Sequence, residues 1–370
     1  MTKRDRLDSL LAERDIESVW FARPNSFAWL TGGDNVIDRE GDVGVAAVGY
    51  DGDTFRVVTN SIEGTRLRDE ELPDGMPVTE YPWYESSLAD AVAEHAETPA
   101  AADFDVPGVE SVDASPLRQP LTDEDADAYR QLGTETAAAV EAICRKLDPD
   151  DTEREIVSAV RGALDARDIE TPVALVGGSE RAQQYRHYTP TEAKLGDYAH
   201  VSVTAERAGL HASCTRTVAF DAPEWLAERH EAAATVETTA LAATQRFGTE
   251  AVGGSEGSGR RDGRAKDVFA AIQDAYDRVG YPGEWEYHHQ GGAAGYAGRE
   301  WIATPTTDDV IRLPMAYAWN PTVQGAKSED TVLVDEDRIE ILTQTGDWPT
   351  EPVTALDDDV TLSRPSILEL

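Results

Sequence analysis

The 370-residue sequence has few lysines, few cysteines and no long apolar segment. Lysine occurs only at Lys3, Lys146, Lys194, Lys266 and Lys327. With 33 Lys and Arg against 71 Asp and Glu, the formal net charge is −38, and the acidic residues are spread along the chain. Such a surface repels phosphate backbones and anionic lipid headgroups. We therefore expect neither nucleic acid nor membrane as a partner, and interpret the charge as a solvated, halophilic surface.

The two cysteines, Cys144 and Cys214, are too few for a disulfide framework, and each lies in an apolar stretch typical of a core. Residues 1–15 are charged throughout and have no apolar signal core, so the sequence predicts a cytoplasmic protein. With 40% hydrophobic residues, 8 Trp and 12 Tyr, the chain is not a disordered polyanion. Its length favours two domains.

The first predicted domain covers residues 1–112. A helical pattern near the amino terminus is followed by strand-like runs at 18–22, 43–49 and 54–60 and by a helical stretch at 61–71. An Ala-, Pro- and Asp-rich stretch at 97–113 is typical of a boundary region.

The second predicted domain covers residues 118–370. One helical pattern ends near Lys146, and further helical patterns cover 151–167, 223–244 and 265–279. Strands are predicted at 172–176, 285–290, 311–320 and 330–335. A Gly-, Arg- and Ser-rich loop at 253–263, with Arg260, Arg261 and the following Arg264, favours a solvated loop or an inter-subunit ion pair over an anion site.

Residues 196–217 contain the most informative pattern of the sequence. Two alternating apolar runs, 198–205 and 210–220, are joined by a polar turn at 206–209, which predicts a β-hairpin. The second run contains Thr215, Arg216 and Thr217.

This hairpin with its Thr-Arg-Thr run resembles the central hairpin of the pita-bread metallopeptidases, which include prolidase, aminopeptidase P, methionine aminopeptidase and the metal-free relative creatinase. The run from Pro24 to Gly32, with Ile62, Glu63 and Arg66 after it, resembles their amino-terminal domain. The resemblance implies an α+β chain, with a small α/β amino-terminal domain and a carboxy-terminal pita-bread domain. It also implies a homodimer.

The resemblance places the family's metal ligands at positions where this sequence has other residues. The two aspartate positions hold Ser202 and Ser213, a histidine position holds Gly292, and a glutamate position holds Asn320. Of the ligands, only Glu329 is retained. One carboxylate cannot hold two divalent cations, so we predict no dinuclear metal site and no cofactor.

His187 is the leading catalytic candidate. The run from Arg186 to Pro190 matches the family's His-Tyr-x-Pro loop, whose histidine contacts substrate and, in creatinase, moves protons without metal. An imidazole suits this role because its pKa lies near neutrality. A histidine that only packs or caps in its loop is the alternative.

Glu329 is the second catalytic candidate, and the predicted substrate-binding residues are Arg299, Glu300, Asn320 and His289. Arg299 replaces a family histidine and can pair with Glu329, either to bind a substrate carboxylate or as a structural ion pair. In a strand at 285–290, His288 and His289 would point to opposite faces, which argues against a zinc site made from both. A new site combining His200 or His211 with Glu329 stays open.

Three functions follow from these residues. The first is a metal-independent hydrolase of a small amide, guanidino or peptide-like compound that uses His187. The second is an inactive pseudopeptidase that binds a small molecule or peptide. The third is a working Xaa-Pro peptidase whose metal ligands lie at positions that we do not recognise.

Overall fold

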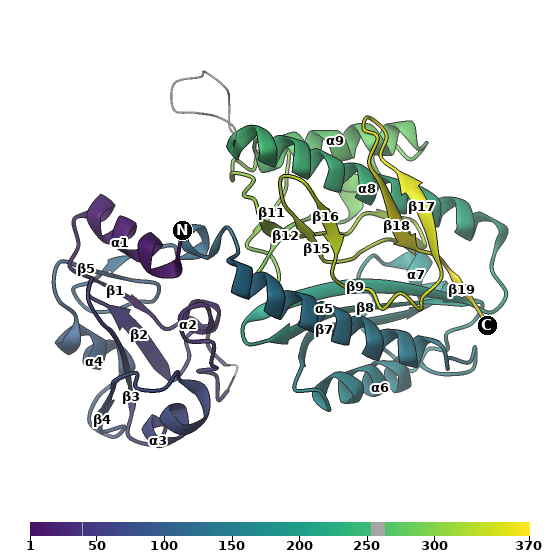
Figure 1. Ribbon diagram of the computed structural model, residues 1–370. Helices are drawn as coiled ribbons and strands as arrows, with labels where there is room; N and C mark the ends of the chain where they lie inside the picture. Colours follow the sequence, from purple (N-terminus) through teal and green to yellow (C-terminus); the bar gives the residue numbers. More distant parts are fainter. Residues whose placement is uncertain (39, 253–262) are drawn as a thin grey trace. The chain divides into compact units, whose positions relative to one another are not determined.

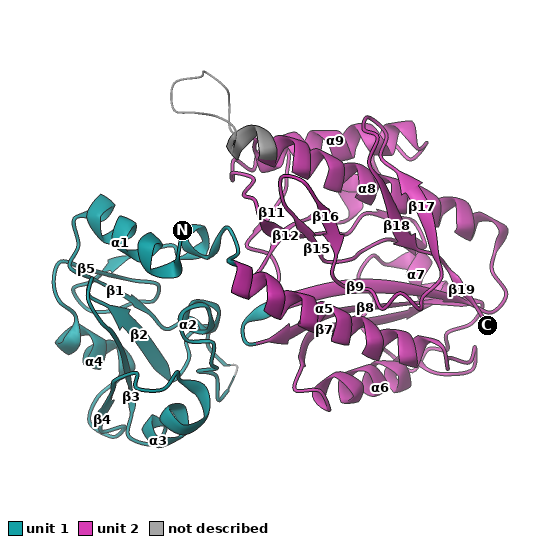
Figure 2. Cartoon of the chain, in the orientation of Figure 1, with its two compact units in different colours: residues 1–122, 208–210 teal, residues 123–207, 211–370 magenta. Residues whose placement is uncertain are grey.

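The computed structural model describes residues 1–38, 40–252 and 263–370, which form two compact units (Figures 1 and 2). The first unit contains residues 1–122 and 208–210, and the second contains residues 123–207 and 211–370. The predicted domain limits, 1–112 and 118–370, stay a prediction. In the predicted Arg-rich loop, Arg260 and Arg261 lie outside the described residues, whereas Arg264 Nη1 donates a hydrogen bond to Asp308 O at 2.9 Å.

The first unit is a mixed sheet with helices around it. The sheet has the strand order β4-β3-β2-β1-β5-β6. Its strands are β1 (Ser18–Phe21), β2 (Ala46–Tyr50), β3 (Phe55–Asn60), β4 (Val78–Tyr81), β5 (Ala100–Ala102) and β6 (Glu110–Ser111). The helices are α1 (Lys3–Arg14), α2 (Pro24–Thr31), α3 (Gly64–Arg66), η1 (Leu67–Glu71), α4 (Leu88–His95) and η2 (Ser115–Arg118).

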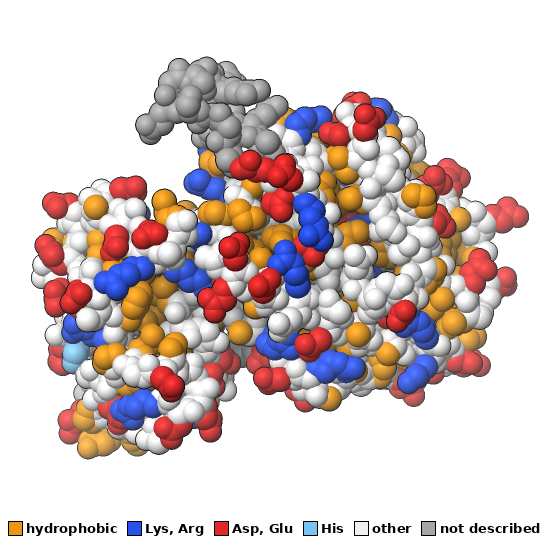
Figure 3. All heavy atoms as spheres, viewed as in Figure 1, with side chains coloured by type: hydrophobic (Ala, Val, Ile, Leu, Met, Phe, Trp, Pro, Cys, Tyr) orange, Lys and Arg blue, Asp and Glu red, His pale blue; other side chains and the backbone are white. Residues whose placement is uncertain are grey.

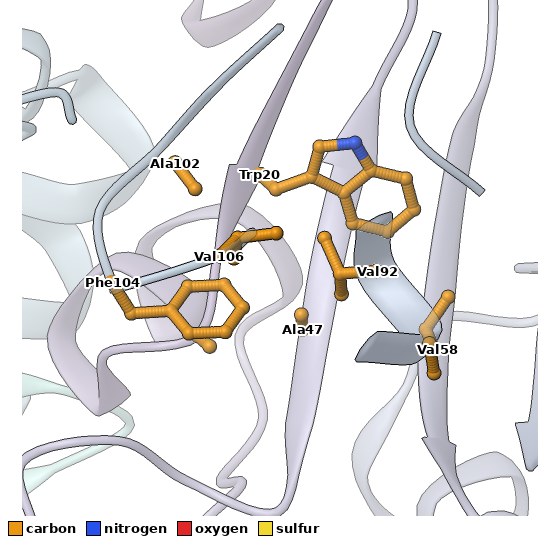
Figure 4. Packing of buried hydrophobic residues seen from close by; sticks show 9 residues of the cluster. Trp20, Ala47, Val58, Val92, Ala102, Phe104 and Val106 are labelled. Atoms are coloured by element: carbon orange, nitrogen blue, oxygen red, sulfur yellow. The ribbon is translucent and has the colours of Figure 1, made fainter. Parts of the chain in front are cut away.

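A cluster of small and aromatic side chains holds helix α4 against this sheet. Trp20 of β1, Val58 of β3 and Val92 of α4 approach one another, and Phe104 closes the other end of the cluster (Figure 4). Burial of such apolar surface is the main stabilising contribution. The interpretation of 97–113 as a boundary region was wrong, because this stretch contributes β5 and β6, and the alanines of β5 pair in parallel with β1 inside the core.

The second unit is larger and has two main sheets, with orders β19-β9-β8-β7 and β11-β10-β12-β15-β16. Its helices are α5 (Asp123–Cys144), α6 (Glu153–Asp165), α7 (Ser179–Gln184), α8 (Glu224–Val252), α9 (Ala265–Arg278) and η3 (Glu284–Tyr287). Its strands are β7 (Glu170–Gly178), β8 (Tyr198–Arg207), β9 (Leu210–Ala219), β10 (Gly291–Ala294), β11 (Trp301–Ile302), β12 (Met315–Trp319), β13 (Thr322–Val323), β14 (Ala326–Lys327), β15 (Val332–Val334), β16 (Ile339–Ile341), β17 (Thr350–Thr354), β18 (Thr361–Pro365) and β19 (Leu368–Glu369).

Helices cover the sheets of this unit from two sides. Helix α6 packs on β7 and α5 on β8, while α8 and α9 pack together and α8 contacts β12 and β15 (Figure 1). Helix α6 begins with a capping box in which Thr152 and Glu155 bond each other's backbone N–H groups.

The predicted hairpin is present as β8 and β9. Ala208 and Gly209 join the strands with φ angles of 50° and 80°, the backbone of a type I′ turn, which matches the twist of hairpin strands. The alternation of apolar residues therefore predicted both the strands and the position of the turn.

The predicted strand at 285–290 was wrong. Residues Glu284–Tyr287 form a short 3₁₀ helix, η3, after Gly283 with a φ of 80°. Aromatic residues favour strands, but a glycine in the left-handed region starts a tight turn here. His288 and His289 thus follow a helical turn, and the alternation used to separate them does not apply.

The surface carries the expected acidic residues without concentrating them. On the face drawn in Figure 3, acidic side chains are scattered, with Lys and Arg side chains between them. Among the described residues, none of the helices combines the length and the apolar character needed to cross a membrane.

Candidate functional site

Ser202 lies in β8 and Ser213 in β9 of the central hairpin, and both side chains are buried. Ser202 Oγ shares a hydrogen bond of 2.8 Å with Thr215 Oγ1, and Ser213 Oγ shares one of 2.9 Å with Thr204 Oγ1. Both hydroxyls thus have partners across the hairpin, and Ser213 Oγ also accepts a hydrogen bond of 3.4 Å from Arg299 Nη1. The resemblance places aspartate ligands at these two positions. In this chain they instead carry hydroxyl groups that are hydrogen-bonded between β8 and β9.

Gly292 lies in β10, in the tightly packed middle of a sheet. A Cβ atom at this position would lie 2.1 Å from the carbonyl oxygen of Trp301 in the neighbouring strand, closer than any real side chain approaches. A histidine cannot occupy this position unless β11 moves away. The structure thus gives a steric reason why this ligand position stays without a side chain.

Asn320 follows β12 and is buried. Its backbone N–H donates to Gln290 O at 3.0 Å, and its Oδ1 has no hydrogen-bond partner among the described residues. A neutral amide here replaces the glutamate of the resemblance. Together, the four positions offer no carboxylate or imidazole, and the donor set does not fit a pair of divalent cations.

Glu329 is enclosed by cations. Lys327 Nζ lies 2.9 Å from its Oε2 and Arg299 Nη2 lies 3.0 Å from its Oε1. Thr215 Oγ1 also donates to Oε2, at 2.9 Å. Burial by itself would raise the pKa of Glu329, but Lys327, Arg299 and the hydrogen bonds together lower this pKa to about 2. We call Arg299, Lys327 and Glu329 the ion-pair cluster.

The predicted pair of Arg299 and Glu329 is thus observed, but its second cation, Lys327, was missed. The spacing of Lys327 and Glu329 in the sequence could have indicated this pair. Lys327 lies two residues before Glu329, and side chains two residues apart on an extended chain share a face. A carboxylate with a pKa of about 2 and two cationic partners is a poor proton carrier at neutral pH. The catalytic role predicted for Glu329 therefore gains no support from this geometry.

The Thr-Arg-Thr run of β9 makes buried polar contacts. Arg216 is buried and pairs with Glu141 at 3.2 Å and Asp330 at 3.0 Å. His200 uses both ring nitrogens, with Thr217 Oγ1 at 2.9 Å and Gly325 O at 2.9 Å. His200 is therefore engaged by its neighbours and does not join Glu329 in a new site, and His211 lies beside Gly298.

Three histidines meet next to the ion-pair cluster. His187 follows α7 and is exposed, His288 is buried, and His289 is exposed. The Nε2 atoms of His187 and His288 are 3.0 Å apart, and the rings of His288 and His289 stack with centroids 4.5 Å apart. The prediction that only one of the adjacent histidines lies on this side was wrong. We call His187, His288 and His289 the histidine cluster.

The environment keeps the histidine cluster uncharged. Burial, with a further contribution from Lys327, lowers the pKa of His187 and of His288. Although His289 is exposed as a residue, stacking on His288 removes water from part of its ring, and this desolvation, followed by Arg299 and Lys327, lowers the pKa of His289 to about 4. Imidazoles near fixed cations are disfavoured in their charged form, so the neutral form of all three is favoured.

The histidine cluster lines a pocket of about 490 Å³, formed by Gln184, Tyr185, Arg186, His187, Tyr287, His288 and His289. An ion pair of 2.8 Å between Arg186 and Glu284 ties its two segments together. Of the predicted substrate-binding residues, only His289 is among these lining residues. Glu300 instead lies near Gly295 and Tyr129. Asn320 is buried, and Arg299 pairs with Glu329.

Comparison with known proteins gives a consistent result for the fold. The model of metallopeptidase family M24 matches residues 127–336. The prolidase from Pyrococcus horikoshii has a TM-score of 0.71 and 16% identity over 93% of this chain and 98% of its own. The X-Pro aminopeptidase from Thermotoga maritima has a TM-score of 0.72 and 16% identity, with both chains covered completely.

A further similar structure is the N-terminal domain of FACT complex subunit SPT16 from chickpea, with a TM-score of 0.67 and 12% identity over 93% of this chain and 96% of its own. No curated protein sequence matches the chain. These identities show the fold alone. They confirm the predicted α+β architecture, an amino-terminal domain followed by a pita-bread domain.

Proposed function

The chain belongs to metallopeptidase family M24, and we propose that it is a member in which ion pairs replace the peptidase metal centre. In this proposal the protein is a pseudopeptidase that binds a small polar molecule or a short peptide in the pocket at His187. The observation that supports this proposal most directly is that Lys327 and Arg299 both pair with Glu329. The residues present supply a fixed positive charge where the family model implies metal.

The physical argument rests on competition for Glu329. A divalent cation would have to displace an ammonium and a guanidinium that are already in contact with this carboxylate, and would leave both cations buried without a counter-charge. Uncompensated buried charges cost several kcal/mol each, about 3 or more in measured cases. With no carboxylate at positions 202, 213 and 320, nothing offsets this cost.

Peptidase activity provides the test of this proposal. Metal-stripped protein is supplied with Mn²⁺ or Co²⁺ and an Xaa-Pro dipeptide, and free proline is measured. We expect no release above the uncatalysed rate. Metal-dependent release that disappears in Glu329→Gln but persists in Glu340→Gln would overturn the proposal. Glu340 is a suitable control because, among the described residues, its ion-pair partners are the exposed side chains of Arg130 and Arg338.

A second candidate function is a metal-independent hydrolase of a small amide or guanidino compound. The exposed His187, hydrogen-bonded to His288 at 3.0 Å in the pocket, favours it. Here His187 would accept a proton from a nucleophilic water. Screening such compounds with wild type, His187→Ala and the distant control His95→Ala separates the two functions, since turnover that survives His187→Ala removes this residue from the role.

The proposal includes two further expectations, a homodimer, which the resemblance implies, and a cytoplasmic location, which the charged residues 1–15 without an apolar signal core predict. Sedimentation velocity in high and low salt would measure the first. A monomer at both salt concentrations would contradict it.

A further inference from the structure

The histidine cluster brings three ligand atoms together outside the positions of the family's metal centre. One ring nitrogen from each of His187, His288 and His289 lies within 4.8 Å of the other two. We propose that these three side chains bind one borderline divalent transition-metal ion, such as Zn²⁺, and leave one coordination position open to the pocket. This goes beyond the proposed function, which assigns no metal to the protein.

The distances fit a mononuclear site after small side-chain movements. In a tetrahedral zinc site with Zn–N bonds of about 2.05 Å, ligand nitrogens are about 3.3 Å apart. The Nε2 atoms of His187 and His288 are already 3.0 Å apart. His289 is exposed, and its ring centroid lies 5.6 Å from that of His187.

The surroundings hold two of the three ligands in place. Gln290 Nε2 donates to the carbonyl of His288 at 2.6 Å, and Tyr276 OH donates to Gln290 Oε1 at 2.9 Å. On the other side, Arg186 next to His187 pairs with Glu284 at the start of η3. These contacts fix the backbone that carries two of the ligands. Metal sites in proteins use such outer contacts to orient their ligands.

Ligand chemistry selects the metal class. Three imidazoles without a thiolate or carboxylate suit zinc, copper or nickel and not calcium or magnesium. Only unprotonated imidazole binds a metal, and burial together with Lys327 and Arg299 favours this form. These cations also repel a divalent ion, and an anion in the open coordination position would offset that repulsion. We therefore expect hydroxide or a ligand carboxylate there.

The experiment uses the metal-stripped full chain, titrated with Zn²⁺ by calorimetry and with Co²⁺ by visible absorption. We expect one equivalent and the strong d–d bands of a tetrahedral Co²⁺ site. Either His187→Ala or His289→Ala should weaken binding by at least about 100-fold. Both residues are exposed, so the variants should fold, and circular dichroism checks this.

His95→Ala is the matched control, because His95 lies at the end of α4 and bonds the carbonyl of Ala91. Binding that is unchanged in His187→Ala and His289→Ala would overturn the proposal and identify acidic surface groups as the binders. Binding of two equivalents that requires Glu329 would instead overturn the proposed function, so the two failures are distinguishable.

Discussion

The ion-pair cluster and the histidine cluster lie close enough for Lys327 to influence the pKa of all three histidines, yet they are built in opposite ways. In the ion-pair cluster, both carboxylate oxygens of Glu329 have charged partners and the group is buried. In the histidine cluster, two of three rings are exposed at a pocket. The first arrangement is closed to solvent, and the second opens to the pocket.

The largest expected effect tests whether the ion-pair cluster is structural. Lys327→Met removes one cation from buried Glu329 and should reduce the free energy of unfolding by about 4 kcal/mol, measured by urea denaturation with an unchanged m-value. The triple variant Arg299→Leu, Lys327→Met, Glu329→Leu removes all charges together and should lose less than the single variant. A triple variant that is less stable than Lys327→Met would contradict this interpretation.

The pH dependence of stability gives the next largest effect. The pKa of Glu329 falls from 4.5 in the unfolded chain to about 2 in the fold, so folding is favoured by its ionised form. This contribution, about 3 kcal/mol, is fully present above pH 4.5 and is lost as the pH falls through 2. Unfolding curves of wild type and the triple variant should therefore converge on acidification, and parallel curves between pH 5 and pH 2 would disprove the assignment.

Sequence patterns predicted most of what surrounds these clusters. The alternation in 198–205 and 210–220 predicted β8 and β9, because one buried face requires a period of two. The positions of Ser202 and Ser213 follow from that register. The pairing of Lys327 with Glu329 was not predicted, although a spacing of two residues would place both on one face of an extended chain.

The histidine cluster was not predictable in the same way. It depends on the turn η3, which begins after Gly283, and no periodicity marks a single helical turn of aromatic and acidic residues. It also depends on the long-range approach of His187, 101 residues away from His288 along the chain. Contacts of this kind come from tertiary packing and not from local propensity.

A smaller effect tests whether the ligand position in β10 can be regained. Gly292→Ala should cost about 2 kcal/mol, because its Cβ would collide with the carbonyl oxygen of Trp301 and the strands must separate. Gly162→Ala is the matched control: a Cβ at Gly162 in α6 meets no atom within 4 Å, and alanine should stabilise the helix by up to about 1 kcal/mol. Equal effects of the two substitutions would show that β11 yields easily.

The smallest expected effect concerns His289 in the metal-free protein. His289 is exposed, makes its main contact by stacking on His288, and carries no charge at neutral pH. His289→Asn should therefore change the free energy of unfolding by no more than about 0.5 kcal/mol, measured by urea denaturation in the presence of a chelator. A loss comparable with that of Lys327→Met would mean that the histidine cluster is as much a part of the fold as the ion-pair cluster. A small loss in chelator, combined with a zinc-induced rise in Tm that wild type shows and His289→Asn lacks, would separate the two clusters by function, because a ligand stabilises only the folded form that binds it.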